Sequence, residues 1–118
     1  MSGNLHGNLL GDLPTALPEE LFTTLAGSGA GAGDVRIERI VSTGHASPEG
    51  FWYDQDGAEF VLLVEGSAGV QMEGGDVRTL APGDWLVIPP HARHRVAWTA
   101  PDRPTVWLAV HYRNGGEG

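Results

Sequence analysis

The sequence contains no cysteine, so it can form no disulfide, no thiolate nucleophile and no zinc site built on cysteine. It also contains no lysine, and its 7 basic residues are all arginine against 15 acidic residues, which gives a formal net charge of −8. A chain with this charge repels phosphate groups, and no basic stripe is present to overcome the repulsion. We therefore expect neither nucleic acid nor an anionic membrane surface as a partner.

Long apolar runs are missing as well. No run approaches the roughly 20 residues that a membrane-spanning helix requires. The N-terminus lacks the basic start and the apolar core of a secretory signal. By elimination, the sequence predicts a cytoplasmic protein.

Glycine and proline, in contrast, are abundant. The chain has 18 Gly and 8 Pro among its 118 residues, and 41% of its residues are hydrophobic, as in an ordinary globular protein. This length is enough for one domain but not for two. The composition therefore indicates a single domain with many turns between short strands.

The first 33 residues differ in character from the rest. An acidic pair, Glu19-Glu20, follows Pro18 and precedes the apolar residues Leu21, Phe22 and Leu25. Proline is favoured in the first turn of a helix, and acidic side chains favour the positive end of the helix dipole. This pattern predicts a short helix in an N-terminal arm.

Composition also suggests how the chain is divided. Residues 27–33 alternate glycine with small residues, which is typical of a flexible linker. We expect residues 1–33 to form an arm with a short helix and this linker, residues 34–113 to form a barrel, and residues 114–118 to form a flexible tail.

From residue 34 onward the hydrophobic pattern changes to a period of two, which is typical of strands. Turn sequences rich in Gly, Pro and Asp separate the apolar runs. Many short strands at close spacing predict a sandwich or barrel. The expected strands cover residues 35–40, 60–65, 68–73, 77–80, 85–88, 93–98 and 105–112.

Two of these strands are apolar on both faces. Residues 60–64 and 106–110 contain no polar residue to mark a solvent-facing side. One face can fill the barrel, and the other needs a second sheet, the N-terminal arm or another subunit to cover it. This pattern makes a homodimer an expected partner arrangement.

The spacing of five residues resembles the two motifs of the cupin family. Glu59 followed by Gly66 is similar to the second half of the first motif, and Gly83, Pro89 and His94 are similar to the second motif. The resemblance covers about residues 34–112 and points to small single-domain bacterial cupins with a conserved barrel. It implies an all-β fold, the cupin or jelly-roll β-barrel, also called a double-stranded β-helix.

The resemblance also implies a metal, because cupins usually hold a divalent cation with two histidines and a glutamate from the first motif and a histidine from the second. This chain lacks the His-x-His pair, whose place is taken by Tyr53 and Gln55 or, in another alignment, by Trp52 and Asp54. The expected cofactor is a divalent transition metal, Fe, Mn, Ni or Zn. The metal-ligand candidates are Gln55, Glu59 and His94, with Asp54 and His111 as further candidates.

Aromatic residues near these positions suggest a small-molecule pocket, since ligand sites combine apolar walls with a few polar groups. The expected wall residues are Trp52, Tyr53, Trp98 and Trp107. If the protein is an enzyme, Glu59, His94 and Tyr53 are the catalytic candidates.

Three functions remain open on the sequence. The first is a metal-dependent cupin enzyme of the dioxygenase, isomerase or lyase type that acts on a small organic molecule. The second is a metal-free cupin that binds or senses a small molecule without catalysis, which the missing His-x-His pair favours. The third is a dimeric structural barrel that serves a partner protein.

Overall fold

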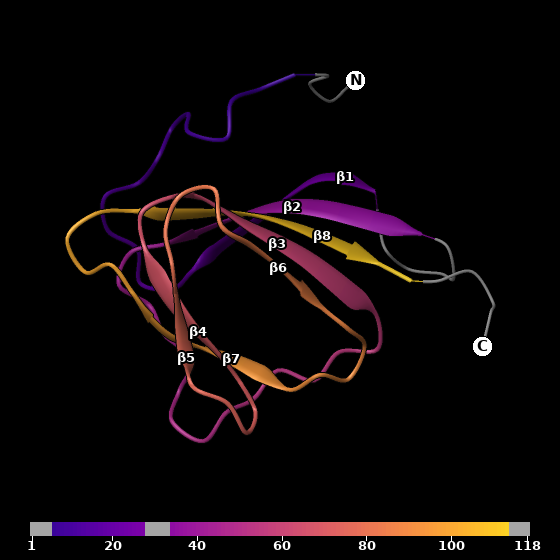
Figure 1. The fold of residues 1–118 in the computed structure, drawn as a ribbon. Helices are drawn as coiled ribbons and strands as arrows, with labels where there is room; N and C mark the ends of the chain where they lie inside the picture. The colour runs from indigo at the N-terminus through magenta and orange to yellow at the C-terminus, as the bar shows by residue number, and fades with distance from the viewer. Residues whose placement is uncertain (1–5, 28–33, 114–118) are drawn as a thin grey trace.

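The computed structural model describes residues 6–27 and 34–113, which form two antiparallel sheets that face each other (Figure 1). One sheet has five strands in the order β1-β2-β8-β3-β6, and the other has three in the order β5-β4-β7. The strands are β1 (Leu21–Gly27), β2 (Val35–Ser42), β3 (Ala58–Glu65), β4 (Ala68–Met72), β5 (Val77–Leu80), β6 (Trp85–Ile88), β7 (His94–Thr99) and β8 (Thr105–Tyr112). The all-β barrel predicted from the sequence is confirmed.

The helix predicted in the N-terminal arm is wrong, because Leu21–Gly27 forms strand β1. This strand pairs antiparallel with β2, from Leu21 opposite Val41 to Gly27 opposite Arg36, with one irregularity after Thr24. A helix of one or two turns is marginal by itself. The neighbouring strand offers hydrogen bonds along the whole segment, and these decide its conformation. The predicted tail and most of the predicted linker lie outside the described residues.

The core lies between the sheets, where alternate residues of each strand face inward. Leu63 and Leu80 are its largest fully buried side chains, and both are less than 3% exposed. Ala109 and Trp107 of β8 pack beside Leu63 in the same cluster. No helix among the described residues is long and apolar enough to cross a membrane.

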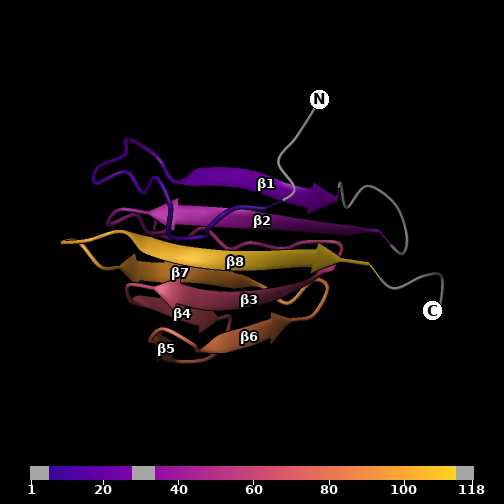
Figure 2. The same ribbon diagram turned by 90° about the horizontal axis from the view of Figure 1, so that it is seen from above.

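Residues 9–17 lie against the outer side of the five-stranded sheet. Figure 2 shows this indigo segment crossing beside the ends of β2 and β8. Arg39 of β2 donates hydrogen bonds from Nη1 to the carbonyl oxygens of Leu9 and Gly11, at 3.2 and 2.7 Å. Leu17 donates its backbone N–H to Oγ1 of Thr43. The arm therefore covers one end of the sheet and leaves the rest of its outer side uncovered.

Candidate functional site

The pairing of strands places four inward-facing residues in one row across the five-stranded sheet. Arg36 of β2 lies opposite His111 of β8, His111 lies opposite Glu59 of β3, and Glu59 lies opposite Ile88 of β6. Directly paired residues project from the same face of a sheet. The row therefore brings residues 23 to 75 positions apart in sequence to one wall of the barrel interior.

This row borders a cavity of about 290 Å³ between the two sheets. Most of the lining surface is apolar, and eight of the lining residues carry charged or polar side chains. Its lining residues are Glu20, Phe22, Arg36, Glu38, Ile40, Tyr53, Gln55, Glu59, Val61, Val70, Ile88, His94, Val96, Trp107 and His111. Apolar walls with few polar anchors are the usual form of a small-molecule site.

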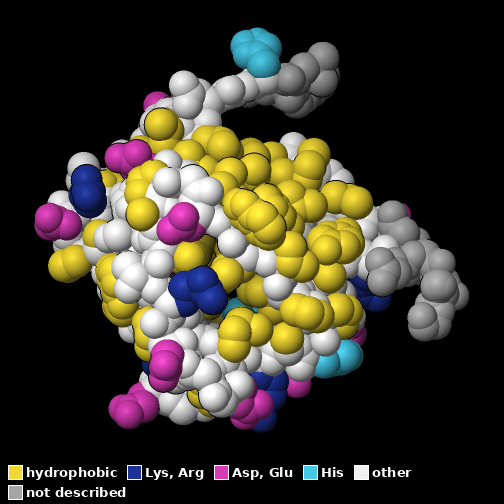
Figure 3. All heavy atoms as spheres, viewed as in Figure 1, with side chains coloured by type: hydrophobic (Ala, Val, Ile, Leu, Met, Phe, Trp, Pro, Cys, Tyr) yellow, Lys and Arg dark blue, Asp and Glu magenta, His cyan; other side chains and the backbone are white. Residues whose placement is uncertain are grey.

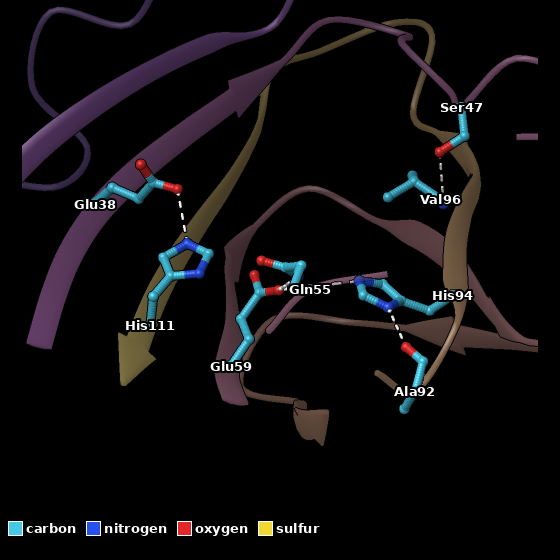
Figure 4. Close-up of polar contacts among 8 residues, drawn as sticks. All are labelled: Glu38, Ser47, Gln55, Glu59, Ala92, His94, Val96 and His111. Atoms are coloured by element: carbon cyan, nitrogen blue, oxygen red, sulfur yellow. Dashed lines mark hydrogen bonds and ion pairs between the residues drawn. The ribbon is translucent and has the colours of Figure 1, made fainter. Parts of the chain in front are cut away.

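Glu59 and His94 face each other across the cavity from opposite sheets (Figure 4). Oε1 of Glu59 lies 3.9 Å from Nε2 of His94, and both residues are less than 8% exposed. Gln55 donates a hydrogen bond of 2.9 Å from Nε2 to the same carboxylate oxygen. The structure thus brings together the three residues that the sequence predicts as metal ligands.

The imidazole of His94 has a fixed orientation. Its Nδ1 lies 2.9 Å from the carbonyl oxygen of Ala92. A carbonyl oxygen can only accept, so Nδ1 carries the proton and donates this hydrogen bond. In the neutral ring, Nε2 therefore presents its lone pair to the cavity and to Glu59.

The loop between β2 and β3 delivers Tyr53 and Gln55 to the site because β7 holds it. Tyr53 and His94 exchange two backbone hydrogen bonds, of 2.7 and 3.1 Å, and their rings stack with centroids 5.4 Å apart. Earlier in the loop, Ser47 bonds to Val96 through both its backbone N–H and its Oγ. Burial raises the pKa of Tyr53, and the carboxylates of Glu20 and Glu59 raise it further, so this phenol stays protonated at neutral pH.

A second polar cluster lies on the β2 side of the cavity. Nε2 of His111 lies 2.9 Å from Oε1 of Glu38, which is 7% exposed, and Figure 4 shows this pair beside Glu59. Nε of Arg36 lies 3.6 Å from the other oxygen of Glu38. His111 therefore faces inward, as a metal ligand in this cavity would have to. Its Nε2, however, is already engaged by the carboxylate of Glu38.

Asp54, the alternative to Gln55, points elsewhere. Its Oδ1 lies 2.8 Å from Nδ1 of His91, and both side chains are about half exposed or more. His91 has a positive φ of 62° and donates its backbone N–H to the carbonyl oxygen of Gln55. The structure therefore aligns Tyr53 and Gln55, and not Trp52 and Asp54, with the interior.

The aromatic candidates are divided by the structure. Tyr53 and Trp107 line the cavity, whereas Trp52 and Trp98 are not among the residues that line it. Trp107 is 4% exposed and donates a hydrogen bond from Nε1 to Oγ of Ser42. Trp98 is 37% exposed.

Sequence reasoning missed the charged lining residues Glu20, Arg36 and Glu38, as well as most of the apolar walls. Charged residues that alternate along β2 resemble a solvent-facing side, so nothing local marks them as interior. The pairing of Glu38 with His111 spans 73 positions and becomes visible only in the folded chain. Oγ of Ser42 donates a hydrogen bond to the carboxylate of Glu20 at the same side of the cavity.

Residues of the chain that the structure describes contain no group of three or more His, Cys, Asp and Glu side chains placed to hold a metal ion. Glu59 and His94 together supply two such side chains. The amide of Gln55 is the third polar group there.

Comparison with known proteins supplies the wider context. The sequence pattern of the cupin domain matches residues 38–111. A Ralstonia eutropha JMP134 protein of known structure, provisionally assigned as a mannose-6-phosphate isomerase, is 52% identical to this chain. The similarity covers 92% of this chain and 97% of that one, with a TM-score of 0.86.

More distant structures share the fold. A cupin superfamily protein of Desulfitobacterium hafniense DCB-2 is 18% identical over 95% of this chain and 94% of that one, with a TM-score of 0.72. A DMSP lyase of Ruegeria pomeroyi DSS-3 is 21% identical over 84% of this chain and 49% of that one, with a TM-score of 0.65. A search of curated proteins finds no match to this chain.

Proposed function

The chain belongs to the cupin family, and from that premise we propose that it binds a small, largely apolar molecule beside a divalent transition-metal cation. Glu59, His94 and Gln55 would hold the cation, and the cavity would hold the molecule. The observation that carries the proposal is the pair of acceptor atoms, Nε2 of His94 and Oε1 of Glu59, that face each other at 3.9 Å.

This separation is too long for a direct hydrogen bond. It lies within the roughly 4.2 Å that two metal–ligand bonds of about 2.1 Å can span. The Nδ1 hydrogen bond of His94 to a backbone carbonyl is the outer interaction that metal-bound histidines usually make. A half-turn of the Gln55 amide would replace its donor with an oxygen acceptor, which would complete a set of three donors.

The charge of the cavity favours a cation as well. Three carboxylates, of Glu20, Glu38 and Glu59, line it against the single guanidinium of Arg36. With both histidines neutral, the excess is two negative charges in a partly buried space. One divalent cation would neutralise this excess, and charges buried without compensation are costly.

A cation here would act as a Lewis acid on an oxygen substituent of the bound molecule. The protonated phenol of Tyr53 lies in the same cavity and would donate a hydrogen bond to that molecule. Apolar side chains such as Ile40, Val61 and Val96 would exclude water from the rest of it. Isomerase, lyase and dioxygenase reactions are all compatible with such a site.

The charges of the cavity also bear on which class of substrate it can bind. A phosphorylated hexose would bring a dianion and several hydroxyl groups into a cavity whose only cationic lining residue, Arg36, is paired with Glu38. Three of the polar lining side chains are the carboxylates of Glu20, Glu38 and Glu59, which repel a phosphate group. The cavity of this chain therefore favours a smaller molecule without a phosphate group.

A second candidate function is a metal-free binding module. Among the described residues, only two ionisable ligands, Glu59 and His94, meet at this point of the cavity, which is few for a metal site. Without a metal, a protonated His94 would form an ion pair with Glu59 at the observed distance. In that case a small molecule would raise the melting temperature of chelator-treated protein, and added metal would not.

Calorimetric titration of Mn(II), Ni(II) and Zn(II) into chelator-treated protein tests the metal proposal. We expect one site per chain, and a loss of at least about tenfold in affinity in the Glu59→Gln and His94→Gln variants. His91→Gln is the matched control, because His91 is exposed and lies outside the cavity. Equal affinities in all three variants and in the native chain would contradict the metal site, provided that melting curves show each variant folded.

A further inference from the structure

The imidazole of His111 lines the cavity but takes no part in the proposed cation site. Its Nε2 lies 2.9 Å from Oε1 of Glu38. A carboxylate oxygen accepts, so in the neutral ring Nε2 carries the proton and donates this hydrogen bond. The lone pair of the ring then belongs to Nδ1, which has no hydrogen-bond partner among the described residues. This lone pair is therefore available to a bound molecule.

Glu38 is itself held in place. Nε of Arg36 lies 3.6 Å from Oε2 of Glu38, the oxygen that His111 does not contact. Arg36 also lies directly opposite His111 in the pairing of β2 with β8. A carboxylate that accepts the N–H of an imidazole fixes the orientation of the ring, and it stabilises the imidazolium that forms when the other nitrogen takes a proton. Glu38 and His111 thus have the geometry of a base and the group that orients it.

Burial distinguishes this imidazole from histidines at the surface. The side chain of His111 is 16% exposed, whereas the side chain of His91 is 64% exposed. Figure 3 shows histidine side chains that stand out at the edge of the molecule, where water solvates the ring. Between mostly apolar walls, the hydrogen bond of an imidazole to a carboxylate is stronger than in water.

The strand register places His111 beside the proposed cation site. His111 of β8 lies directly opposite Glu59 of β3, and the Cβ atoms of such a pair lie about 5 Å apart on one face of the sheet. Figure 4 shows the imidazole between the carboxylates of Glu38 and Glu59. A molecule with an oxygen substituent at the gap between Glu59 and His94 would bring its neighbouring carbon atoms to this side of the cavity.

We propose that His111 is the general base that removes a proton from the carbon atom next to a carbonyl group of the bound molecule, with Glu38 as its positioning residue. The inference rests on the proposed function, which places an oxygen of that molecule beside Glu59. In this step the C–H bond breaks, the proton goes to Nδ1, and the electron pair of the bond moves into the carbonyl group. Return of the proton to the opposite side of the same carbon inverts it. Such a reaction needs no oxidant, which favours an isomerase over a dioxygenase.

Exchange of a carbon-bound hydrogen with solvent tests the proposal. The probe is acetoin, a small uncharged α-hydroxy ketone, incubated with the Zn(II)-loaded full chain in D₂O and followed by ¹H NMR. We expect the native chain to exchange the hydrogen next to the carbonyl group faster than buffer with the same Zn(II) concentration. His111→Gln should remove this acceleration, a loss of roughly 100-fold or more, while its Zn(II) affinity stays within about threefold of the native value.

Glu38→Gln tests the positioning role. It keeps an oxygen acceptor for Nε2 of His111 but removes the charge that stabilises the imidazolium. The exchange rate should fall by at least about tenfold, while the acetoin concentration at half-saturation stays within about threefold. A merely structural role would change both. His91→Gln is the matched control and should exchange like the native chain, because His91 lies outside the cavity.

A measurement on the native chain without acetoin is independent of catalysis and of how the variants fold. Imidazole ¹⁵N NMR should show the proton of His111 on Nε2 and none on Nδ1. A proton on Nδ1 overturns the proposal, because the lone pair would then face Glu38. So does a native chain no faster than buffer, or a folded His111→Gln variant that exchanges at the native rate. A native chain that binds no Zn(II) in calorimetry overturns the proposed function as well, so the two failures are distinguishable.

Discussion

Nε2 of His94 lies 3.9 Å from Oε1 of Glu59, and the two atoms belong to opposite sheets of the sandwich. Each residue is anchored by a separate hydrogen bond, from Gln55 to Glu59 and from His94 to the carbonyl of Ala92. The remaining gap separates a carboxylate oxygen from an imidazole nitrogen. The proposed function rests on what fills this gap.

The neighbouring pair Gln55 and Asp54 allows a direct test of the ligand set. Gln55→Ala should weaken metal binding by about tenfold or more, because it removes the third donor beside Glu59. Asp54→Ala should change the affinity less than threefold, because Asp54 bonds to His91 outside the cavity. Calorimetric titration of Mn(II) measures both, and a larger loss in Asp54→Ala would favour the other alignment.

His111 provides a second test of the same kind. Its Nε2 is engaged by Glu38, so His111→Gln should leave the stoichiometry of metal binding at one per chain and the affinity within about threefold. The same substitution should lower the free energy of unfolding by about 1–3 kcal/mol, because buried Glu38 loses its closest hydrogen-bond partner. A loss of metal affinity as large as that of His94→Gln would show that His111 turns from Glu38 to the metal.

Tyr53 should ionise at higher pH than an ordinary tyrosine. Burial raises its pKa above 10.0, and the charges of Glu20 and Glu59 add to this effect. Because the folded chain then holds the proton more tightly than the unfolded chain, stability should fall as pH rises above about 10. Absorbance titration near 295 nm, with Tyr53→Phe to assign the transition, measures the pKa.

The Glu59→Gln variant completes this experiment. It removes one of the charges that disfavour the phenolate, so the pKa of Tyr53 should move back toward the ordinary value without reaching it. An unchanged pKa in this variant would mean that Tyr53 does not sense the charge of Glu59.

The two motif glycines should differ in their tolerance of alanine. Both have a positive φ, 90° for Gly66 and 97° for Gly83, as their places in tight turns predict. A Cβ at Gly66 would lie 2.7 Å from Cα of Thr105 and 2.8 Å from the carbonyl oxygen of Pro104, whereas nothing lies within 4 Å at Gly83.

Gly83→Ala should therefore cost about 1–2 kcal/mol from backbone strain alone. Gly66→Ala should cost roughly 1–3 kcal/mol more, because the backbone must move to admit the methyl group. Urea unfolding of both variants measures the difference, and equal losses would contradict the close packing at Gly66.

Local pattern was sufficient for much of this fold. Between residues 58 and 112, alternation and turn residues predict strands that agree with the observed ones to within about two residues at each end. Leu21–Gly27 escaped this reasoning, because its conformation depends on pairing with β2 and not on its own sequence. The position of Gln55 beside Glu59 followed from motif spacing, but the choice between Gln55 and Asp54 needed the folded loop.

The second polar cluster shows the limit of sequence reasoning most clearly. Glu38 lies in the charged segment Arg36-Ile37-Glu38-Arg39, as a solvent-facing residue would, yet it is buried against His111. Only the register between β2 and β8, where Glu38 lies opposite Ala109, places it inside. Contacts between strands distant in sequence have no local pattern, so no single stretch of the chain reveals them.

Imidazole ¹⁵N NMR during a Zn(II) titration tests the central claim most directly, since it reports on each histidine separately. The account predicts that, up to one equivalent, Nε2 of His94 shifts on binding the metal while its Nδ1 keeps the proton donated to Ala92. The Nε2 resonances of His91 and His111 should remain close to their starting positions. A saturable shift at another histidine, or no shift at His94, would contradict a cation between His94 and Glu59.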